Sequence, residues 1–129
     1  MILDGKVVAA DIKQRLKEEI AAANKRAPHL VIITVGDDPA SKVYVRNKIK
    51  TAEEIGIEVR HYCFAADDEP EAVLELIGIL NDAYVIDGIM VQLPLPEGWD
   101  ERAIIDTIDS SKDVDGLTTT NIGRLRSGQ

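Results

Sequence analysis

The feature that most restricts the fold is a regular alternation of helix-period segments with short apolar runs. The apolar runs cover residues 29–35, 57–64 and 84–92, and a segment of helical periodicity separates each from the next. Strands joined by such long crossovers pair in parallel, and helices must cover both faces of a parallel sheet. The sequence therefore predicts an α/β fold, a three-layer α-β-α domain with a mostly parallel sheet.

The helices are predicted from periodicity and end signals. The first spans residues 7–26 before Pro28, and its apolar stripe has four-residue spacing: Val8, Ile12, Leu16 and Ile20. The second begins with an N-cap at Asp38 and Pro39 in the first turn, and it ends at Gly56.

Two further helices follow the second and third apolar runs. Asp68 and Glu71 match a capping box for one, and Asp100 suits the N-cap of another that runs to about residue 108. A further helical turn is predicted at residues 121–126, from a weaker pattern.

Composition excludes several classes of protein. A formal net charge of −8 argues against a nucleic-acid partner, and 45% hydrophobic residues argue against disorder. The single cysteine, Cys63, permits no internal disulfide, and His29 and His61 are not spaced as a pair of metal ligands, so we expect no metal site. Residues 1–6 contain no signal core and no later segment matches a membrane span, so a cytoplasmic protein without a membrane partner is expected.

Ligands of parallel α/β sheets bind at the carboxyl ends of the strands. Three segments meet that edge, residues 36–50, 92–96 and 112–120. In the first, Ser41, Tyr44 and Lys48 share one helix face, which by itself could be a solvated surface. The polar Gln92 at the end of an apolar strand favours a site there.

The third segment, which contains Asp115 and Gly116, could by itself be only an acidic turn that ends at Gly116, so alone it is a weak signal for a site. A glycine-rich dinucleotide fingerprint between strand and helix is absent from the sequence. The turn after the first apolar run instead contains Asp37 and Asp38, whose charges would repel a phosphate. The sequence therefore predicts no nucleotide site in this chain.

Four segments together resemble the N-terminal domain of the bifunctional methylenetetrahydrofolate dehydrogenase/methenyltetrahydrofolate cyclohydrolase family: residues 35–57, 88–96, 112–117 and 121–125. The resemblance implies a fold like the N-terminal domain of amino-acid dehydrogenases, with residues 1–129 as the tetrahydrofolate-binding catalytic domain. It also implies that the C-terminal NAD(P)-binding Rossmann domain of the family is absent from this chain. Ser110 stands where the family usually has proline.

The same resemblance implies an enzyme of one-carbon metabolism and purine biosynthesis. It oxidises 5,10-methylenetetrahydrofolate to the methenyl form and hydrolyses this to 10-formyltetrahydrofolate. The catalytic residues implied are Lys48 and Gln92. The implied substrate-binding residues are Ser41, Tyr44, Lys48, Gln92, Leu93, Pro94 and Asp115. In the family, NADP or NAD accepts the hydride of the oxidation. The resemblance implies that this chain contains no cofactor-binding residue and that no metal is needed.

Folate is thus the expected small-molecule partner. The family forms homodimers that look to be joined mainly through the cofactor domains, so we expect residues 1–129 alone to be a monomer or a weak dimer. One alternative is a non-catalytic folate-binding or assembly module, a truncated half-protein. A second is a phosphoacceptor receiver domain, which would need an Asp where the third strand ends in Gln92.

Overall fold

The computed structural model describes residues 4–129 and centres on a parallel sheet of three strands in the order β2-β1-β3. These are β1 (His29–Val35), β2 (Glu58–Phe64) and β3 (Gly88–Val91). Strand β1 pairs along its whole length with β2 and, from Leu30 to Ile33, with β3. The predicted parallel α/β fold is confirmed.

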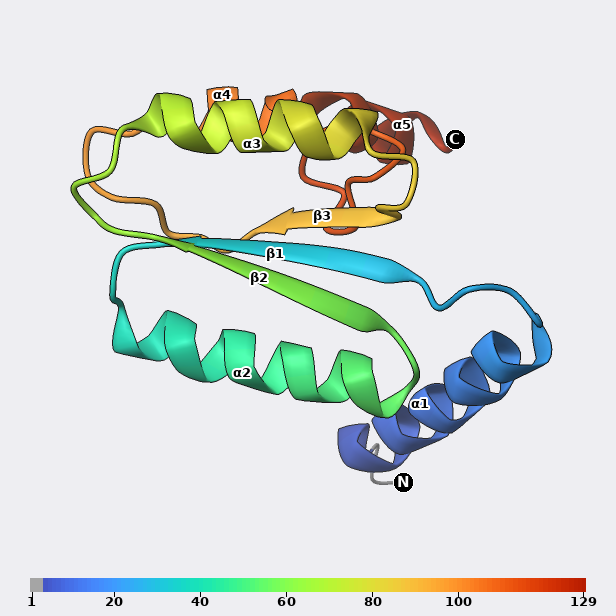
Figure 1. Cartoon of the computed structure of the whole chain (residues 1–129). Helices are drawn as coiled ribbons and strands as arrows, with labels where there is room; N and C mark the ends of the chain where they lie inside the picture. Colours follow the sequence, from blue (N-terminus) through green and yellow to red (C-terminus); the bar gives the residue numbers. More distant parts are fainter. Residues whose placement is uncertain (1–3) are drawn as a thin grey trace.

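Helices lie on both sides of this sheet (Figure 1). Helix α2 (Pro39–Glu54) covers one face, and α3 (Pro70–Asp82), α4 (Glu101–Thr107) and α5 (Thr119–Ser127) lie on the other side. Helix α1 (Gly5–Ala22) lies beyond the sheet, beside the C-terminal end of α2. No helix within residues 4–129 has both the length and the apolarity that a membrane crossing requires.

The aliphatic core is divided by the sheet. The larger part packs α3 and α4 against β1 and β3 and includes Val31, Ile33, Ile89, Val73, Ile77 and Ile104. The smaller part, under α2, contains Ile32, Val45 and Met90. Since each buried aliphatic side chain contributes about 1.5–3 kcal/mol, the layer formed by α3 and α4 contributes most of the stability of the sheet.

Helix α2 begins and ends as predicted. The Asp38 carboxylate accepts the backbone N–H of Ser41 at 2.7 Å, and Pro39 occupies the first turn. Gly56 follows the helix with a φ of +96°, and a Cβ there would lie 3.3 Å from Cγ2 of Ile20. This glycine thus permits both the left-handed turn and the close approach of α1.

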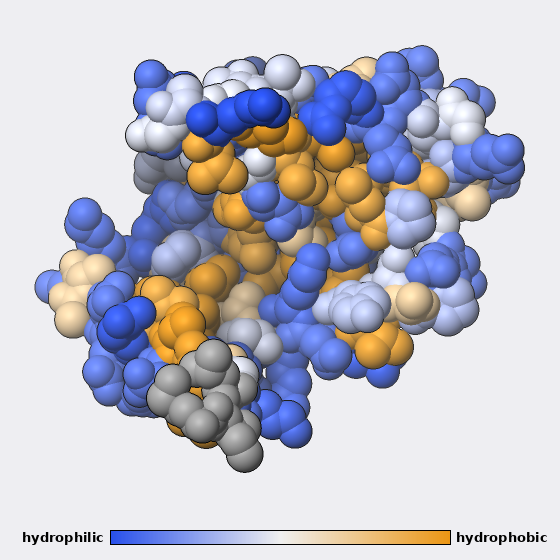
Figure 2. Space-filling model, turned by 180° about the vertical axis from the view of Figure 1, so that it is seen from behind, coloured by the Kyte–Doolittle hydropathy of each residue, from blue (hydrophilic) through white to orange (hydrophobic). Residues whose placement is uncertain are grey.

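The prediction for the first helix was wrong in two respects. Helix α1 ends at Ala22 and not at residue 26, because the chain turns at Asn24, whose φ is +48°. Most of its apolar stripe is also uncovered: within the described residues none of α1 is buried, Val8 is 52% exposed, and of the stripe only Ile20 is half-buried. Apolar side chains accordingly gather on the surface at the lower left of Figure 2, over α1.

Two further boundaries differ from prediction. The capping box is wrong, because Glu69 is the N-cap of α3 and makes no side-chain cap bond, while Asp68 accepts the N–H of Ala65 at 2.7 Å. Strand β3 starts at Gly88 and not at residue 84, since Tyr84 is 83% exposed and Ile86 N–H closes a turn onto the carbonyl of Ala83.

The last two helices agree more closely with prediction. Asp100 caps α4 by accepting the N–H of Ala103 at 3.0 Å, as expected. Helix α5 is longer than the predicted turn at residues 121–126, because the hydroxyl of Thr118 caps it by accepting the N–H of Asn121 at 3.2 Å.

Candidate functional site

Lys48 and Gln92 are brought together at the carboxyl edge of the sheet. Lys48 lies on α2, and its Nζ donates to Oε1 of Gln92 at 3.1 Å and lies 3.6 Å from Sδ of Met90. Met90 belongs to the buried strand β3, and Gln92 is the first residue after that strand. The lysine amine is therefore held over the end of the sheet by a residue that is distant in sequence.

Gln92 is itself fixed by two hydrogen bonds. Its backbone N–H donates to the carbonyl of Ile33 at 2.8 Å, which continues the pairing with β1 beyond the end of β3. Its side-chain Nε2 donates to the carbonyl of Leu93 at 2.8 Å, at a Leu93–Pro94 peptide bond that is cis. With the amide nitrogen engaged, the amide oxygen points to Lys48.

Asp115 lies on a loop beside the same strand. The loop begins with a parallel bridge between Ile89 and Asp113, so it runs alongside β3 toward the carboxyl edge. A small internal cavity is lined by Val91, Asp113 and Asp115 among others. Asp115 is exposed, and within residues 4–129 no side-chain hydrogen bond or ion pair engages it. Its carboxylate is thus available to a ligand at the edge where Gln92 lies.

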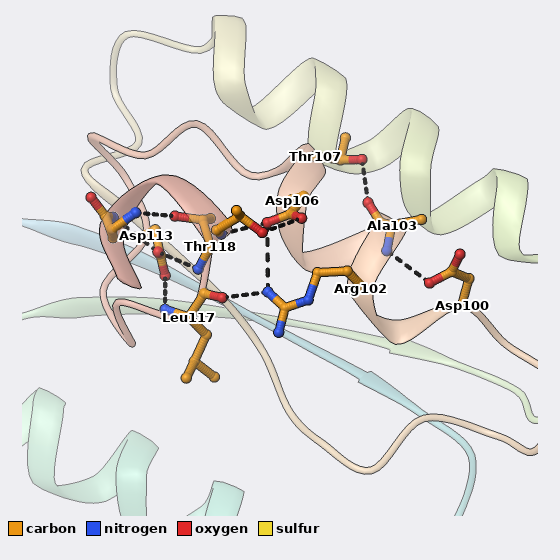
Figure 3. A network of polar contacts seen from close by, with 10 residues as sticks. Asp100, Arg102, Ala103, Asp106, Thr107, Asp113, Leu117 and Thr118 are labelled. Carbon is orange, nitrogen blue, oxygen red and sulfur yellow. Dashed lines mark hydrogen bonds and ion pairs between the residues drawn. The ribbon is translucent and has the colours of Figure 1, made fainter. Parts of the chain in front are cut away.

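Asp113 organises this loop from inside. Its carboxylate accepts the N–H of Leu117 at 3.2 Å, the N–H of Thr118 at 2.9 Å and the side-chain N–H of Asn121 at 2.9 Å. Burial raises the pKa of Asp113, but these hydrogen bonds outweigh it and the pKa is lowered overall. Figure 3 shows the neighbouring contacts, in which Arg102 donates to the carbonyl of Leu117 at 2.7 Å.

Tyr44 and Ser41 stand nearer the N-terminal end of the same helix. Tyr44 is 64% exposed, one turn before Lys48, with its ring uncovered by the described residues. Ser41 is half-buried. Of the predicted set, Lys48 and Gln92 are in direct contact, while Tyr44 and Asp115 lie apart from them as exposed groups.

A groove of about 610 Å³ lies on the opposite flank of α2, toward β2. It includes Ser41, Gln92 and Pro94 of the predicted set but not Tyr44, Lys48 or Asp115. His61 and Cys63 also line it, although nothing in their sequence pattern predicted a role in a site. Strand alternation places both on the α2 face.

His61 makes two contacts in this groove. Its Nε2 lies 2.9 Å from Oγ1 of Thr34 and 3.5 Å from Sγ of Cys63. Burial lowers the pKa of His61, which favours the neutral imidazole.

The described residues do not fit a nicotinamide dinucleotide. The turn from β1 to α2 offers the helix N-terminus at which a pyrophosphate would bind, but the Asp38 carboxylate already occupies it by accepting the N–H of Ser41. The turns after β2 and β3 lead to helices whose N-caps are Glu69 and Asp100, also acidic. Among residues 4–129, no three His, Cys, Asp or Glu side chains are grouped so as to hold a metal ion.

The parallel sheet with helices on both sides defines a domain of the α/β class, in which ligands bind at the carboxyl edge of the sheet. Residues 3–115 match the family model described as Tetrahydrofolate dehydrogenase/cyclohydrolase, catalytic domain. The chain belongs to this family.

Individual relatives agree with this assignment. The chain is 46% identical over 130 residues to the Bifunctional protein FolD of Rhodopseudomonas palustris (strain BisB5), covering 98% of the chain and 44% of that protein. It superposes with a TM-score of 0.93 on the bifunctional enzyme FolD-methylenetetrahydrofolate dehydrogenase/cyclohydrolase from Campylobacter jejuni, at 40% identity, covering 99% of this chain and 46% of that one.

A third relative was solved with ligands. The Trypanosoma brucei N5,N10-methylenetetrahydrofolate dehydrogenase-cyclohydrolase, complexed with NADP cofactor and inhibitor, superposes with a TM-score of 0.92 at 34% identity, covering 97% of this chain and 43% of that one. The chain thus spans less than half the length of the relatives that it matches.

Proposed function

We propose that this chain supplies the folate site and the catalytic lysine of a methylenetetrahydrofolate dehydrogenase/cyclohydrolase. The enzyme oxidises 5,10-methylenetetrahydrofolate to the methenyl form, which water then opens to 10-formyltetrahydrofolate. The observation that carries the proposal is the 3.1 Å hydrogen bond between Lys48 Nζ and Gln92 Oε1, which joins α2 to the end of β3 at the ligand-binding edge. The family match supports the choice of folate.

Substrate binding is assigned to the exposed polar and aromatic groups of that edge. A reduced pterin presents its 2-amino group and the adjacent ring N–H as a pair of donors, and the exposed Asp115 carboxylate can accept both. The exposed ring of Tyr44 offers a flat apolar surface to the p-aminobenzoyl ring. Ser41, Leu93 and Pro94 complete the proposed substrate-binding surface.

Lys48 is assigned the proton transfers of ring opening. The Lys48 amine acts as the general base and accepts a proton from the water whose oxygen bonds to the methenyl carbon. As the hydroxyl of the adduct loses its proton and becomes a carbonyl, the bond from carbon to N5 breaks and N5 takes up a proton. One proton is released overall, and Gln92 keeps the amine directed at these atoms.

NADP or NAD accepts the hydride in the first reaction. Because the strand-to-helix turns of this chain do not fit a dinucleotide, we assign that cofactor to a Rossmann domain outside residues 1–129. The NADP-bound relative from Trypanosoma brucei supports NADP in the family. A cytoplasmic location and a homodimer formed through the cofactor domain are parts of the same proposal.

Replacement of Lys48 by Met tests the assignment. The aliphatic stem and the helix propensity remain, so the fold and folate affinity should be preserved, while ring opening of methenyltetrahydrofolate should fall by about 10²–10⁴-fold. The rate is followed as loss of methenyl absorbance above the spontaneous rate. Lys17→Met, on an exposed lysine of α1 that lies outside the groove and the proposed site, is the matched control and should open the ring at the unmodified rate.

A Lys48→Met variant that opens methenyltetrahydrofolate as fast as the Lys17→Met variant would defeat the catalytic assignment. If the 129-residue chain turns over too slowly for comparison, both variants are measured in a chain extended by the cofactor domain of a relative.

A further inference from the structure

We infer that Asp113 is a positioning residue of the proposed folate site. It fixes the shape of the loop of residues 113–118, which we call the Asp115 loop, and thereby sets the place of the Asp115 carboxylate. The inference rests on the proposed function, because it concerns how Asp115 meets the pterin.

The Asp113 carboxylate closes the Asp115 loop onto itself. One carboxylate oxygen accepts the N–H of Leu117, and the other accepts the N–H of Thr118 together with the side chain of Asn121. Both oxygens are therefore used, and both bind groups on the far side of Asp115. The chain reverses between these anchors through Gly116, whose φ is +67°. Asp115 lies at the tip of a closed ring.

The strand side of the loop is anchored through Lys112. Its Nζ donates to the carbonyls of Leu80, Asn81 and Ala83 at 2.9, 2.7 and 2.9 Å, at the C-terminal end of α3. Its own carbonyl accepts the N–H of Ile89 on β3 at 2.8 Å. The residue before the loop is thus held by both a helix and the sheet.

The other side of the loop is anchored on α5. Thr118 is the N-cap of that helix, and Asn121 donates both to Asp113 and, at 2.8 Å, to the carbonyl of Ser110. Asp113 is therefore the residue that joins the two anchored sides. A carboxylate whose backbone is held in this way loses little freedom on binding, which is the condition for preorganised recognition.

Asparagine at position 113 would have nearly the same shape but could not replace these contacts. An amide offers a single acceptor oxygen, and its NH2 group would face the N–H donors that the second carboxylate oxygen now accepts. Asp113→Asn should therefore loosen the loop without leaving a cavity.

A double-mutant cycle of Asp113→Asn and Asp115→Ala tests the inference. The probe is 5-formyltetrahydrofolate, a stable reduced folate, and the dissociation constant is measured by titration calorimetry on the 129-residue chain. With Asp115 present, Asp113→Asn should raise the dissociation constant about tenfold, within the range of coupling between neighbouring residues. In the Asp115→Ala background the same change should raise it less than twofold.

Asp87→Asn is the matched control. It weakens the hydrogen bonds that the Asp87 carboxylate accepts from Arg26, at 2.6 and 2.9 Å, and from the N–H of His29, at 2.8 Å, and in residues 4–129 no hydrogen bond or ion pair joins Asp87 to the Asp115 loop. This variant should unfold at a lower temperature but bind the probe within twofold of the unmodified chain. The coupling to Asp115 is thus separated from a general loss of stability.

The inference is overturned if Asp113→Asn still lowers the affinity for the probe tenfold in the Asp115→Ala background. It is also overturned if Asp113→Asn alone leaves the affinity unchanged. Either outcome leaves the folate assignment intact. Failure of the unmodified chain to bind the probe overturns the proposed function, and the inference with it. Where Asp113→Asn does not fold, the cycle is run with Asn121→Ala, and the same two outcomes decide.

Discussion

Replacement of Lys112 by Met should destabilise the domain strongly, although the same exchange at Lys48 should not. The Lys112 ammonium donates to the main-chain carbonyls of Leu80 and Asn81 in the last turn of α3 and of Ala83 directly after it, at distances of 2.7 to 2.9 Å and in a partly buried setting. A single hydrogen bond to a charged group contributes about 1.5–3 kcal/mol, and breaking a buried charged contact costs about 3–5 kcal/mol. Because the three bonds share one donor group and are not additive, we expect a loss of about 3 kcal/mol.

That loss is a large part of the roughly 5–15 kcal/mol that stabilises a typical domain. It corresponds to a fall in melting temperature of roughly 12 °C at about 4 °C per kcal/mol. Urea and thermal unfolding followed by far-ultraviolet circular dichroism measure both quantities, with Lys48→Met as the control that changes by less than about 1 kcal/mol. If Lys112→Met changes the free energy of unfolding no more than Lys48→Met does, the anchoring role of Lys112 is refuted.

Three further outcomes are expected. The pKa of Asp87 is lowered, first by hydrogen bonds from Arg26 and then by the N–H of His29. Its contribution to stability is therefore present at neutral pH and is lost as pH falls through its folded pKa. In urea unfolding between about pH 6 and pH 3, the free energy of unfolding should fall less steeply for Asp87→Asn than for the unmodified chain. The 129-residue chain should reduce neither NADP nor NAD with methylenetetrahydrofolate, and reduction above background would contradict the separate cofactor domain. Sedimentation at micromolar concentration should show a monomer or weak association, and a tight dimer would disprove this.

The segments predicted best from sequence are those whose ends are set by local chemistry. Strand β1 was predicted at both ends, and α2 began at Asp38 and Pro39 as expected, because a capping carboxylate and a proline act within one turn of the helix. The N-cap of α3 is Glu69, one residue after the predicted Asp68, and the proline in the first turn, Pro70, is a better signal for this start than the capping box. The end of α1 depends on a turn at Asn24 that periodicity does not reveal.

The site was harder to predict than the fold, because its geometry depends on groups that are remote in sequence. The helical spacing of Ser41, Tyr44 and Lys48 predicted a shared face, but it could not show that Lys48 would contact Gln92 across the sheet. Nor could the sequence around Asp115 show which of the two neighbouring carboxylates makes hydrogen bonds within the loop. Asp113 and Asp115 are two residues apart, and the hydrogen bonds of the fold make one internal to the loop and leave the other exposed.

The position of β2 at the edge of the sheet affects how readily the protein could aggregate. An edge strand presents unpaired N–H and carbonyl groups, to which the backbone of another molecule can add and start open-ended growth. In the described part of the chain no further strand covers the outer side of β2, yet its sequence discourages such addition: Glu58 and Arg60 are exposed at the start of the strand, and the Glu58 carboxylate also lies 2.6 Å from Nε2 of His29. A strand arriving at this edge would have to bury both signs of charge, so the charged residues of β2 act as gatekeepers against aggregation.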